Sequence, residues 1–218
     1  GKEGMLELNM KGALPGKPEE VNRDFSDDFS GDQFKLAYNF LRNPQEKDYQ
    51  LCPEEKCLKL HGTKVTLSME DSPTFLGIRQ KEFTVTAEVK IRLNEGKEGS
   101  RAGLTAYYNK SFHYDIYVGK KQEGFYVALG KQLFDVQTDV AADNVEEDSW
   151  IYLKILTDKE FYRFYYSLNG QDYIYLGQGL TAGLCTEITE TMTFTGVYIG
   201  MFAENGEAEF KDFSVRIV

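Results

Sequence analysis

The side chains that could carry acid–base chemistry in this chain do not form a recognisable set. There are 35 Asp and Glu residues but only two His, His61 and His113. A general base needs a partner group within hydrogen-bonding distance. The sequence contains no Gly-x-Ser-x-Gly, no His-Glu-x-x-His and no phosphate-binding loop. We therefore expect no catalysis from this chain alone, and replacement of His113 is the direct test of the contrary hypothesis.

Metal chemistry has one candidate group. Asp27 and Asp28 lie in FSDDF near the first expected strand, and Asp212 lies in FKDF near the last. Calcium requires six to eight oxygen ligands, many of them backbone carbonyls. Aspartates at such positions also cap turns through short side-chain hydrogen bonds. We expect no required cofactor, and we keep a structural calcium ion on Asp28 and Asp212 as a hypothesis beside the turn-capping role.

The three cysteines allow two interpretations. Cys52 and Cys57 are five positions apart and Cys185 is remote. They are too few for a disulfide-stapled scaffold, and no zinc-ligand spacing accompanies them. A Cys52 to Cys57 bridge would suit a secreted protein. Two reduced thiols in a loop remain the alternative.

Tyrosine is abundant, with 14 residues, and sugar binding on an open tyrosine face is a second functional hypothesis. Strand alternation places Tyr165 on the face opposite Tyr162 and Tyr166. A row of tyrosines on an exposed face would indicate a freestanding, lectin-like carbohydrate-binding module. An exposed apolar face would instead indicate docking to another domain.

The elements that position these residues are strands. From Phe83 to Leu93 apolar and polar residues alternate strictly, which predicts a half-buried antiparallel strand. Asn169-Gly170 and Asn205-Gly206 predict hairpin turns. No apolar pattern with helical period persists, so the fold class is all-β, a jelly-roll sandwich of two antiparallel sheets. Further strands are expected at 103–108, 113–118, 124–129, 150–156, 162–167, 197–203 and 210–217.

Composition limits the partners and the domain count. Residues 1–22 have the composition of a linker, and residues 23–218 read as one sandwich domain. The formal net charge of −10 disfavours nucleic acid and anionic surfaces as partners. No apolar stretch has the length of a membrane span. Acidity and the cysteine pair favour a periplasmic or extracellular location.

Five segments are informative through their order and spacing: DDFSGDQFKLAYNFLRNP (27–44), SPTFLGIRQ (72–80), RAGLTAYYNKSFHYDIYV (101–118), FYYSLNGQDYIYLG (164–177) and FTGVYIGMFA (194–203). Together they resemble the C-terminal concanavalin-A-like domain of family 43 glycoside hydrolases, the β-xylosidase and α-L-arabinofuranosidase family. The resemblance covers nearly the whole chain. It also implies that residues 1–22 are a linker from a missing upstream catalytic domain.

The resemblance implies a non-catalytic accessory domain beside a five-bladed catalytic propeller that holds the carboxylates. In that family the accessory domain can lend an aromatic side chain to the rim of the substrate pocket. Phe194 is the candidate here, because a sugar ring packs well on an aromatic face; a core phenylalanine is the alternative. Arg79 is the candidate for the domain interface, because a planar guanidinium can bridge carboxylates or carbonyls across a contact; an ordinary surface arginine is the alternative. A xylo- or arabino-oligosaccharide would then bind at the domain boundary.

Overall fold

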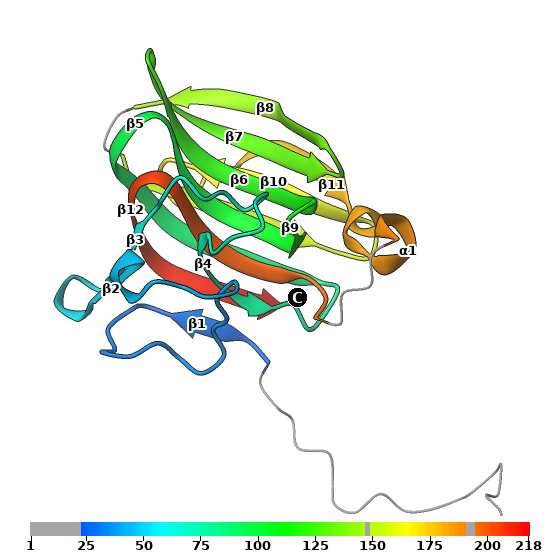
Figure 1. The fold of residues 1–218 in the computed structure, drawn as a ribbon, viewed down its shortest axis with the longest axis horizontal. Helices are drawn as coiled ribbons and strands as arrows, with labels where there is room; N and C mark the ends of the chain where they lie inside the picture. Colours follow the sequence, from blue (N-terminus) through cyan, green and yellow to red (C-terminus); the bar gives the residue numbers. More distant parts are fainter. Residues whose placement is uncertain (1–22, 147–148, 191–194) are drawn as a thin grey trace, which may run out of the picture.

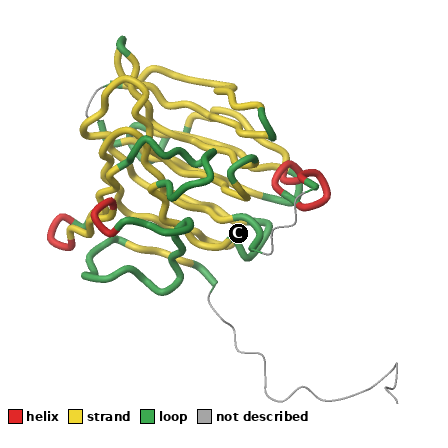
Figure 2. Tube along the Cα trace, in the orientation of Figure 1, coloured by secondary structure: helices red, strands yellow, loops and turns green. Residues whose placement is uncertain are grey.

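The computed structural model describes residues 23–146, 149–190 and 195–218. These residues form twelve strands and four short helical turns (Figures 1 and 2). The strands are β1 (Phe25–Asp27), β2 (Tyr49–Cys52), β3 (Cys57–His61), β4 (Thr74–Arg79), β5 (Val85–Asn109), β6 (Phe112–Lys121), β7 (Gly124–Leu133), β8 (Val136–Val145), β9 (Ile151–Thr157), β10 (Phe161–Ser167), β11 (Ile174–Leu180) and β12 (Tyr198–Ile217). The helical turns are η2 (Glu46–Asp48), η3 (Pro53–Glu55), η4 (Thr181–Leu184) and α1 (Thr186–Thr189).

Two long strands, β5 and β12, run through both layers of the sandwich. The first half of β5 pairs with β9 and with the second half of β12, while its second half pairs with β6 and with the first half of β12. One layer is therefore β11-β10-β9-β5-β12-β3-β2, with β1 on β12, and the other is β8-β7-β6-β5-β12-β4. All of these pairings are antiparallel, which confirms the predicted fold class.

The alternating segment at the start of β5 is buried as predicted, except at its first residue. Val85, Val89 and Ile91 are at most 2% exposed, whereas Phe83 is 58% exposed. The strand begins only at Val85, whose N–H donates to the Thr157 hydroxyl at 3.2 Å. Phe83 lies before this anchor, outside the strand, so its side chain is free to face outward.

The two predicted Asn-Gly turns have different outcomes. Asn169-Gly170 joins the paired strands β10 and β11, and Gly170 has a φ of 75°, as expected of a hairpin turn. The Asn205-Gly206 hairpin prediction was wrong. The two arms around it do not pair with each other, because each pairs with β5, and β12 instead curves from one layer to the other (Figure 1). Asn205, with a φ of 57°, makes this bend, and its N–H donates to the Thr63 carbonyl at 2.7 Å.

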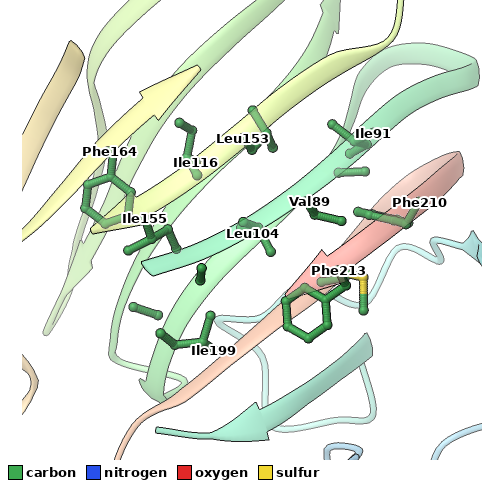
Figure 3. Packing of buried hydrophobic residues seen from close by; sticks show 14 of the residues in the cluster. Val89, Ile91, Leu104, Ile116, Leu153, Ile155, Phe164, Ile199, Phe210 and Phe213 are labelled. Carbon is green, nitrogen blue, oxygen red and sulfur yellow. The ribbon is translucent and has the colours of Figure 1, made fainter. Parts of the chain in front are cut away.

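The main core lies between the two layers. Figure 3 shows apolar side chains of β5, β9, β10 and β12 meeting there, and Ile91, Leu104 and Phe164 are fully buried. Each residue of this size contributes about 1.5–3 kcal/mol when its side chain leaves water. A second, smaller cluster covers the outer face of the β4 layer, beneath the 62–73 segment: Leu67, Phe75, Tyr107, Tyr117, Ala128 and Phe202.

Candidate functional site

Apolar side chains are exposed together at one end of the sandwich, which we call the α1 end and define as residues 79–85, 133–136 and 180–189. Figure 1 shows α1 at this end. Its parts lie beside one another, since Leu133 borders the same hollow as Leu180, and Phe83 borders the same hollow as Leu184. Phe134, Ile188 and Leu180 are about 60% exposed there (62%, 58% and 59%). Exposed apolar groups that gather in one place mark an interaction surface more often than scattered ones do.

Two hollows flank the η4 and α1 segment. One, of about 300 Å³, lies between this segment and the turn before β5, with Phe83, Tyr108 and Leu184 among its walls. The other, of about 350 Å³, lies on the side of β6 and β7, with Phe134, Leu180 and Ile188 around it. Such hollows are large enough to receive one or two side chains of another protein surface.

Tyr114 on β6 anchors β11 and η4 at the α1 end. It is 1% exposed and donates its hydroxyl hydrogen to the Leu180 carbonyl at 3.0 Å. A Cβ at Gly179 or Gly183 would meet the Tyr114 ring or hydroxyl at 2.5 or 2.2 Å. The two glycines therefore allow β11 and η4 to lie directly on the ring. Burial raises the pKa of Tyr114 to about 12, so the hydroxyl keeps its proton.

Arg79 connects the α1 end to the segment of Phe194. Phe194 itself lies outside the described residues. The Arg79 side chain donates from Nε to the carbonyl of Thr195, the residue that follows Phe194. Arg79 is exposed and also borders a third hollow, of about 350 Å³, beside Phe25 and Ile217. It thus positions the backbone next to the proposed rim residue.

His113 belongs to a buried polar cluster that has the outline of a catalytic triad. Its Nδ1 lies 2.9 Å from both carboxylate oxygens of Asp115, and its Nε2 lies 3.1 Å from the Ser68 hydroxyl. Nucleophile, base and orienting acid are arranged in this order in acyl-transfer enzymes. The spacing alone would allow such a role.

The surroundings of this cluster fit a structural role better. Ser68 donates its only hydroxyl hydrogen to the Gln132 side-chain carbonyl at 3.1 Å, so it has none to give to His113. His113 is 0% exposed, and neither it nor Ser68 lines any of the hollows described above. Burial raises the pKa of Asp115, but contacts with His113 and the Arg101 guanidinium outweigh it and hold that pKa below its usual range.

The carboxylates proposed for calcium are directed at their own turns and at lysines. Asp27 accepts the Phe29 N–H and lies 3.4 Å from the Lys35 ammonium group. Asp28 accepts hydrogen bonds from Ser30 and lies 3.3 Å from the Lys56 ammonium group. A calcium ion would have to displace these cations, so this arrangement fits the turn-capping role better. Calcium on Asp28 and Asp212 stays an untested prediction, and Asp212 is exposed on β12.

The tyrosines divide between the two faces as alternation predicts. Tyr162 and Tyr166 are buried in the core, whereas Tyr165 lies on the outer face, with its ring 5.4 Å from that of Tyr175. Cations already cover neighbouring rings of this face: the Lys154 ammonium lies 3.4 Å from the Tyr173 ring centre. Lys90 covers Trp150 and Tyr152 in the same way. A sugar would have to displace these lysines to stack there.

Comparison with known proteins identifies the family. The profile of the "Beta xylosidase C-terminal Concanavalin A-like domain" matches residues 26–216. The non-reducing end α-L-arabinofuranosidase BoGH43B of Bacteroides ovatus is 29% identical over 211 residues, which are 95% of this chain and 39% of the relative. A β-xylosidase of Bacillus subtilis is 24% identical over 213 residues, 92% of this chain and 39% of the relative.

Solved structures of family 43 proteins have the same fold as this chain. The Bacteroides ovatus xyloglucan-locus protein GH43B has a TM-score of 0.85 at 27% identity, over 94% of this chain and 42% of that one. The Bacillus licheniformis GH43 protein BlXynB superposes with a TM-score of 0.82 at 24% identity, over 93% of this chain and 40% of that one, which supports the fold. This chain spans about two fifths of the length of these relatives. No helix among the described residues is long and apolar enough to cross a bilayer. With its profile match over residues 26–216, the chain belongs to the family of β-xylosidase C-terminal concanavalin-A-like domains of glycoside hydrolase family 43.

Proposed function

We propose that this chain is a non-catalytic accessory domain that docks on the catalytic propeller of a family 43 glycoside hydrolase and shapes its substrate pocket. The observation that carries the proposal is the α1 end, where exposed apolar side chains surround two hollows. Binding of a partner to an apolar surface of this kind lowers the free energy, because apolar side chains are removed from water. The relatives extend beyond this chain by about three fifths of their length, which leaves room for such a partner.

In this proposal Phe194 contacts the sugar and Arg79 positions the backbone beside Phe194. Phe194 forms one wall of the sugar pocket at the domain boundary, where a xylo- or arabino-oligosaccharide binds. Arg79 is a positioning residue, because its guanidinium holds the carbonyl of the adjacent Thr195. In this proposal the parent enzyme breaks down plant polysaccharides, and its catalytic carboxylates lie outside this chain. The acid–base pair of an inverting glycosidase stands roughly 6.5–9.5 Å apart across the bond that is cleaved.

Docking is tested by binding of this chain to the separately expressed catalytic region of its parent polypeptide. Ile188→Asp places a charge among the apolar residues of the α1 end and should weaken association at least tenfold. Leu168→Asp is the matched control, since Leu168 is similarly exposed (56% against 58%) but lies in the turn that follows β10, away from the α1 end. Equal affinities of the two variants would contradict docking through the α1 end.

The role of Phe194 is tested in the full parent enzyme. Phe194→Ala should raise KM for short xylo- or arabino-oligosaccharides by roughly tenfold, since an aromatic wall contributes about 1 kcal/mol or more. Arg79→Met should raise KM less and leave kcat close to the wild-type value. Leu168→Ala serves as the control for unspecific effects. Unchanged kinetics in Phe194→Ala would contradict the pocket-rim role.

The competing function is sugar binding by the isolated chain. Calorimetric titration with xylo- and arabino-oligosaccharides, beside hydrolysis assays on aryl xylosides and arabinosides, separates the hypotheses. We expect no binding and no turnover. Binding without turnover would make the chain a carbohydrate-binding module. Turnover lost on His113→Ala would assign catalysis to the cluster around His113.

A further inference from the structure

Two cysteines close the hairpin of β2 and β3. Cys52 is the last residue of β2 and Cys57 the first of β3, and the pairing register places them directly opposite each other. The turn between them contains η3 and Lys56, whose φ of 48° lets the chain reverse. Both residues are free thiols in this structure.

The register brings the two thiols within bonding range. Residues directly opposite in an antiparallel pair have Cα atoms about 4.5–5.5 Å apart, inside the roughly 4.4–6.8 Å range of disulfides. Their side chains project on the same face of the hairpin. The Cys57 thiol donates to the Glu55 carboxylate at a long 3.9 Å, so the Cys57 sulfur is held only weakly where it is. A disulfide would therefore need rotation of side chains rather than movement of strands.

The two thiols differ in access to solvent, and the buried one is a weaker acid than an ordinary thiol. Cys57 is 0% exposed, whereas Cys52 is partly exposed. Burial, together with Cys52 and the carboxylates of Glu209 and Glu55, raises the pKa of Cys57 to about 12. An external reagent therefore reacts with the accessible Cys52 thiol first. The buried Cys57 thiol reacts afterwards, within the protein.

The carboxylates around Cys57 do not make a metal site of the pair. Glu55, Cys57 and Glu209 do converge, with ligand atoms within 4.8 Å of one another. However, Glu209 is already paired with Arg92 at 2.7 Å and Lys59 at 3.2 Å. The positive charges of Arg92 and Lys59 would repel a divalent cation at this position. Oxidation of the two thiols is therefore favoured over metal binding.

We propose that Cys52 and Cys57 are an oxidisable pair that forms a disulfide across the end of the β2–β3 hairpin. The oxidant is an external disulfide, such as that of a thiol–disulfide oxidoreductase or oxidised glutathione. The Cys52 thiolate attacks one sulfur of this disulfide and releases the first thiol. Cys57 loses its proton, attacks the Cys52 sulfur of the mixed disulfide and releases the second thiol. Two protein thiols and one disulfide thus become one protein disulfide and two thiols.

The bridge would stabilise the edge of one layer. β3 pairs with β12, and among the described residues β2 pairs only with β3. Since the disulfide limits the freedom of the unfolded chain, the oxidised protein should melt roughly 3–8 °C higher than the reduced protein. Oxidation should also become faster as the pH rises, because Cys57 must lose its proton before the second step.

The test is a thiol count on the 218-residue chain. After incubation with oxidised glutathione, removal of the reagent and denaturation, we expect one reactive thiol, Cys185, instead of three. The intact mass should fall by about 2 Da, with one peptide pair linked through Cys52 and Cys57. The Cys185→Ser control should lose both remaining thiols and show the same rise in melting temperature.

Cys52→Ser and Cys57→Ser are the variants that break the pair. Cys52→Ser should keep its fold, because Cys52 is only partly buried, and should show no rise in melting temperature on oxidation. Three reactive thiols after oxidation would overturn the proposal. So would thiols that are protected by bound zinc and released by a chelator without loss of mass, since the cluster would then be a metal site.

Discussion

The two ends of the sandwich are built differently. The α1 end exposes apolar side chains around hollows, whereas the opposite end, where β5 and β12 cross between the layers, is polar. The hollow at the opposite end, of about 610 Å³, is lined by His61, Asn94, Lys97, Lys120 and Glu207, among others. Of the fourteen large apolar residues that are exposed among the described residues, eight lie at or beside the α1 end: Phe83, Leu133, Phe134, Val136, Leu180, Ile188, Ile217 and Val218.

The difference extends to what holds each end together. At the opposite end the partly buried Arg101 guanidinium lies 2.6 Å from the buried carboxylate of Glu204, and Ser100 donates to the Asn205 carbonyl at 2.6 Å. At the α1 end the fixed points are tyrosine hydroxyl groups, such as that of Tyr114 on the Leu180 carbonyl. The opposite end thus has a polar, solvent-exposed surface. The α1 end has exposed apolar side chains on a backbone that buried tyrosines anchor, as a docking surface requires.

The largest effect is expected from removing the ion pair of the opposite end. Arg101→Leu leaves Glu204, which is 2% exposed, without its cation, and should lower the free energy of unfolding by about 3–5 kcal/mol. Urea unfolding measures this directly. Arg216→Leu, on the exposed end of β12, should cost less than about 0.5 kcal/mol. Similar losses in the two variants would mean that the buried pair is not what closes this end.

The next effect concerns Tyr114. Tyr114→Leu removes the ring under Gly179 and Gly183 together with the hydrogen bond to Leu180, and should cost about 2–4 kcal/mol. Amide hydrogen exchange should then become faster in residues 180–189. Phe210→Leu, a fully buried control on β12, should destabilise the protein without that local change. Equal exchange in both variants would contradict the anchoring role of Tyr114.

A smaller effect is expected at the surface. Phe134→Ser should reduce the fluorescence of a bound apolar dye such as anilinonaphthalene sulfonate by on the order of half, because it removes one wall of a hollow. The free energy of unfolding should fall by at most about 1.5 kcal/mol, which is the loss of the edge-to-face contact between Phe134 and Phe112. Val140→Ser on the exposed strand β8 is the control and should leave the dye signal unchanged. A signal that drops equally in both variants would show that the α1 end is no special apolar surface.

Strands in which apolar and polar residues alternate over a long run were readable from the sequence, whereas the short strands β3 and β11 were not predicted. In β5, β9 and β10 every second residue enters the core, so the alternation of residue types follows burial. Strand β8 was missed because it is largely exposed on both faces and its residue types do not alternate. The Asn205-Gly206 bend was misread because a positive φ serves a hairpin and a crossing between layers equally well, and the choice depends on β5.

The α1 end could not be predicted in the same way. Phe134 and Ile188 border one hollow and Phe83 borders the other. The three residues are distant in sequence and come to the same end of the sandwich only when the strands align. The available signal was weak: apolar residues in segments that lack strand alternation, such as GLTAGLCTEI. Arg79 was singled out by family resemblance, but its bond to the Thr195 carbonyl depends on the final packing of β4 against β12.

The smallest expected effect is a pH dependence at the turn before β10, beside the α1 end. The Arg163 guanidinium and the N–H groups of Glu160 and Phe161 hold the pKa of Asp158 at about 2, below its usual value of 3.8. A carboxyl whose pKa is lowered by folding adds stability above its unfolded pKa, and this stability is lost as the pH falls toward the folded pKa. Asp158→Asn should therefore melt lower than wild type near pH 6, by at most about 2 °C since the group is exposed. The difference should shrink between pH 4 and pH 2, because the wild type then loses the same charge. A difference in melting temperature that stays constant from pH 6 to pH 2 would show that Asp158 acts through its shape and hydrogen bonds alone, and that charge contributes nothing to this turn.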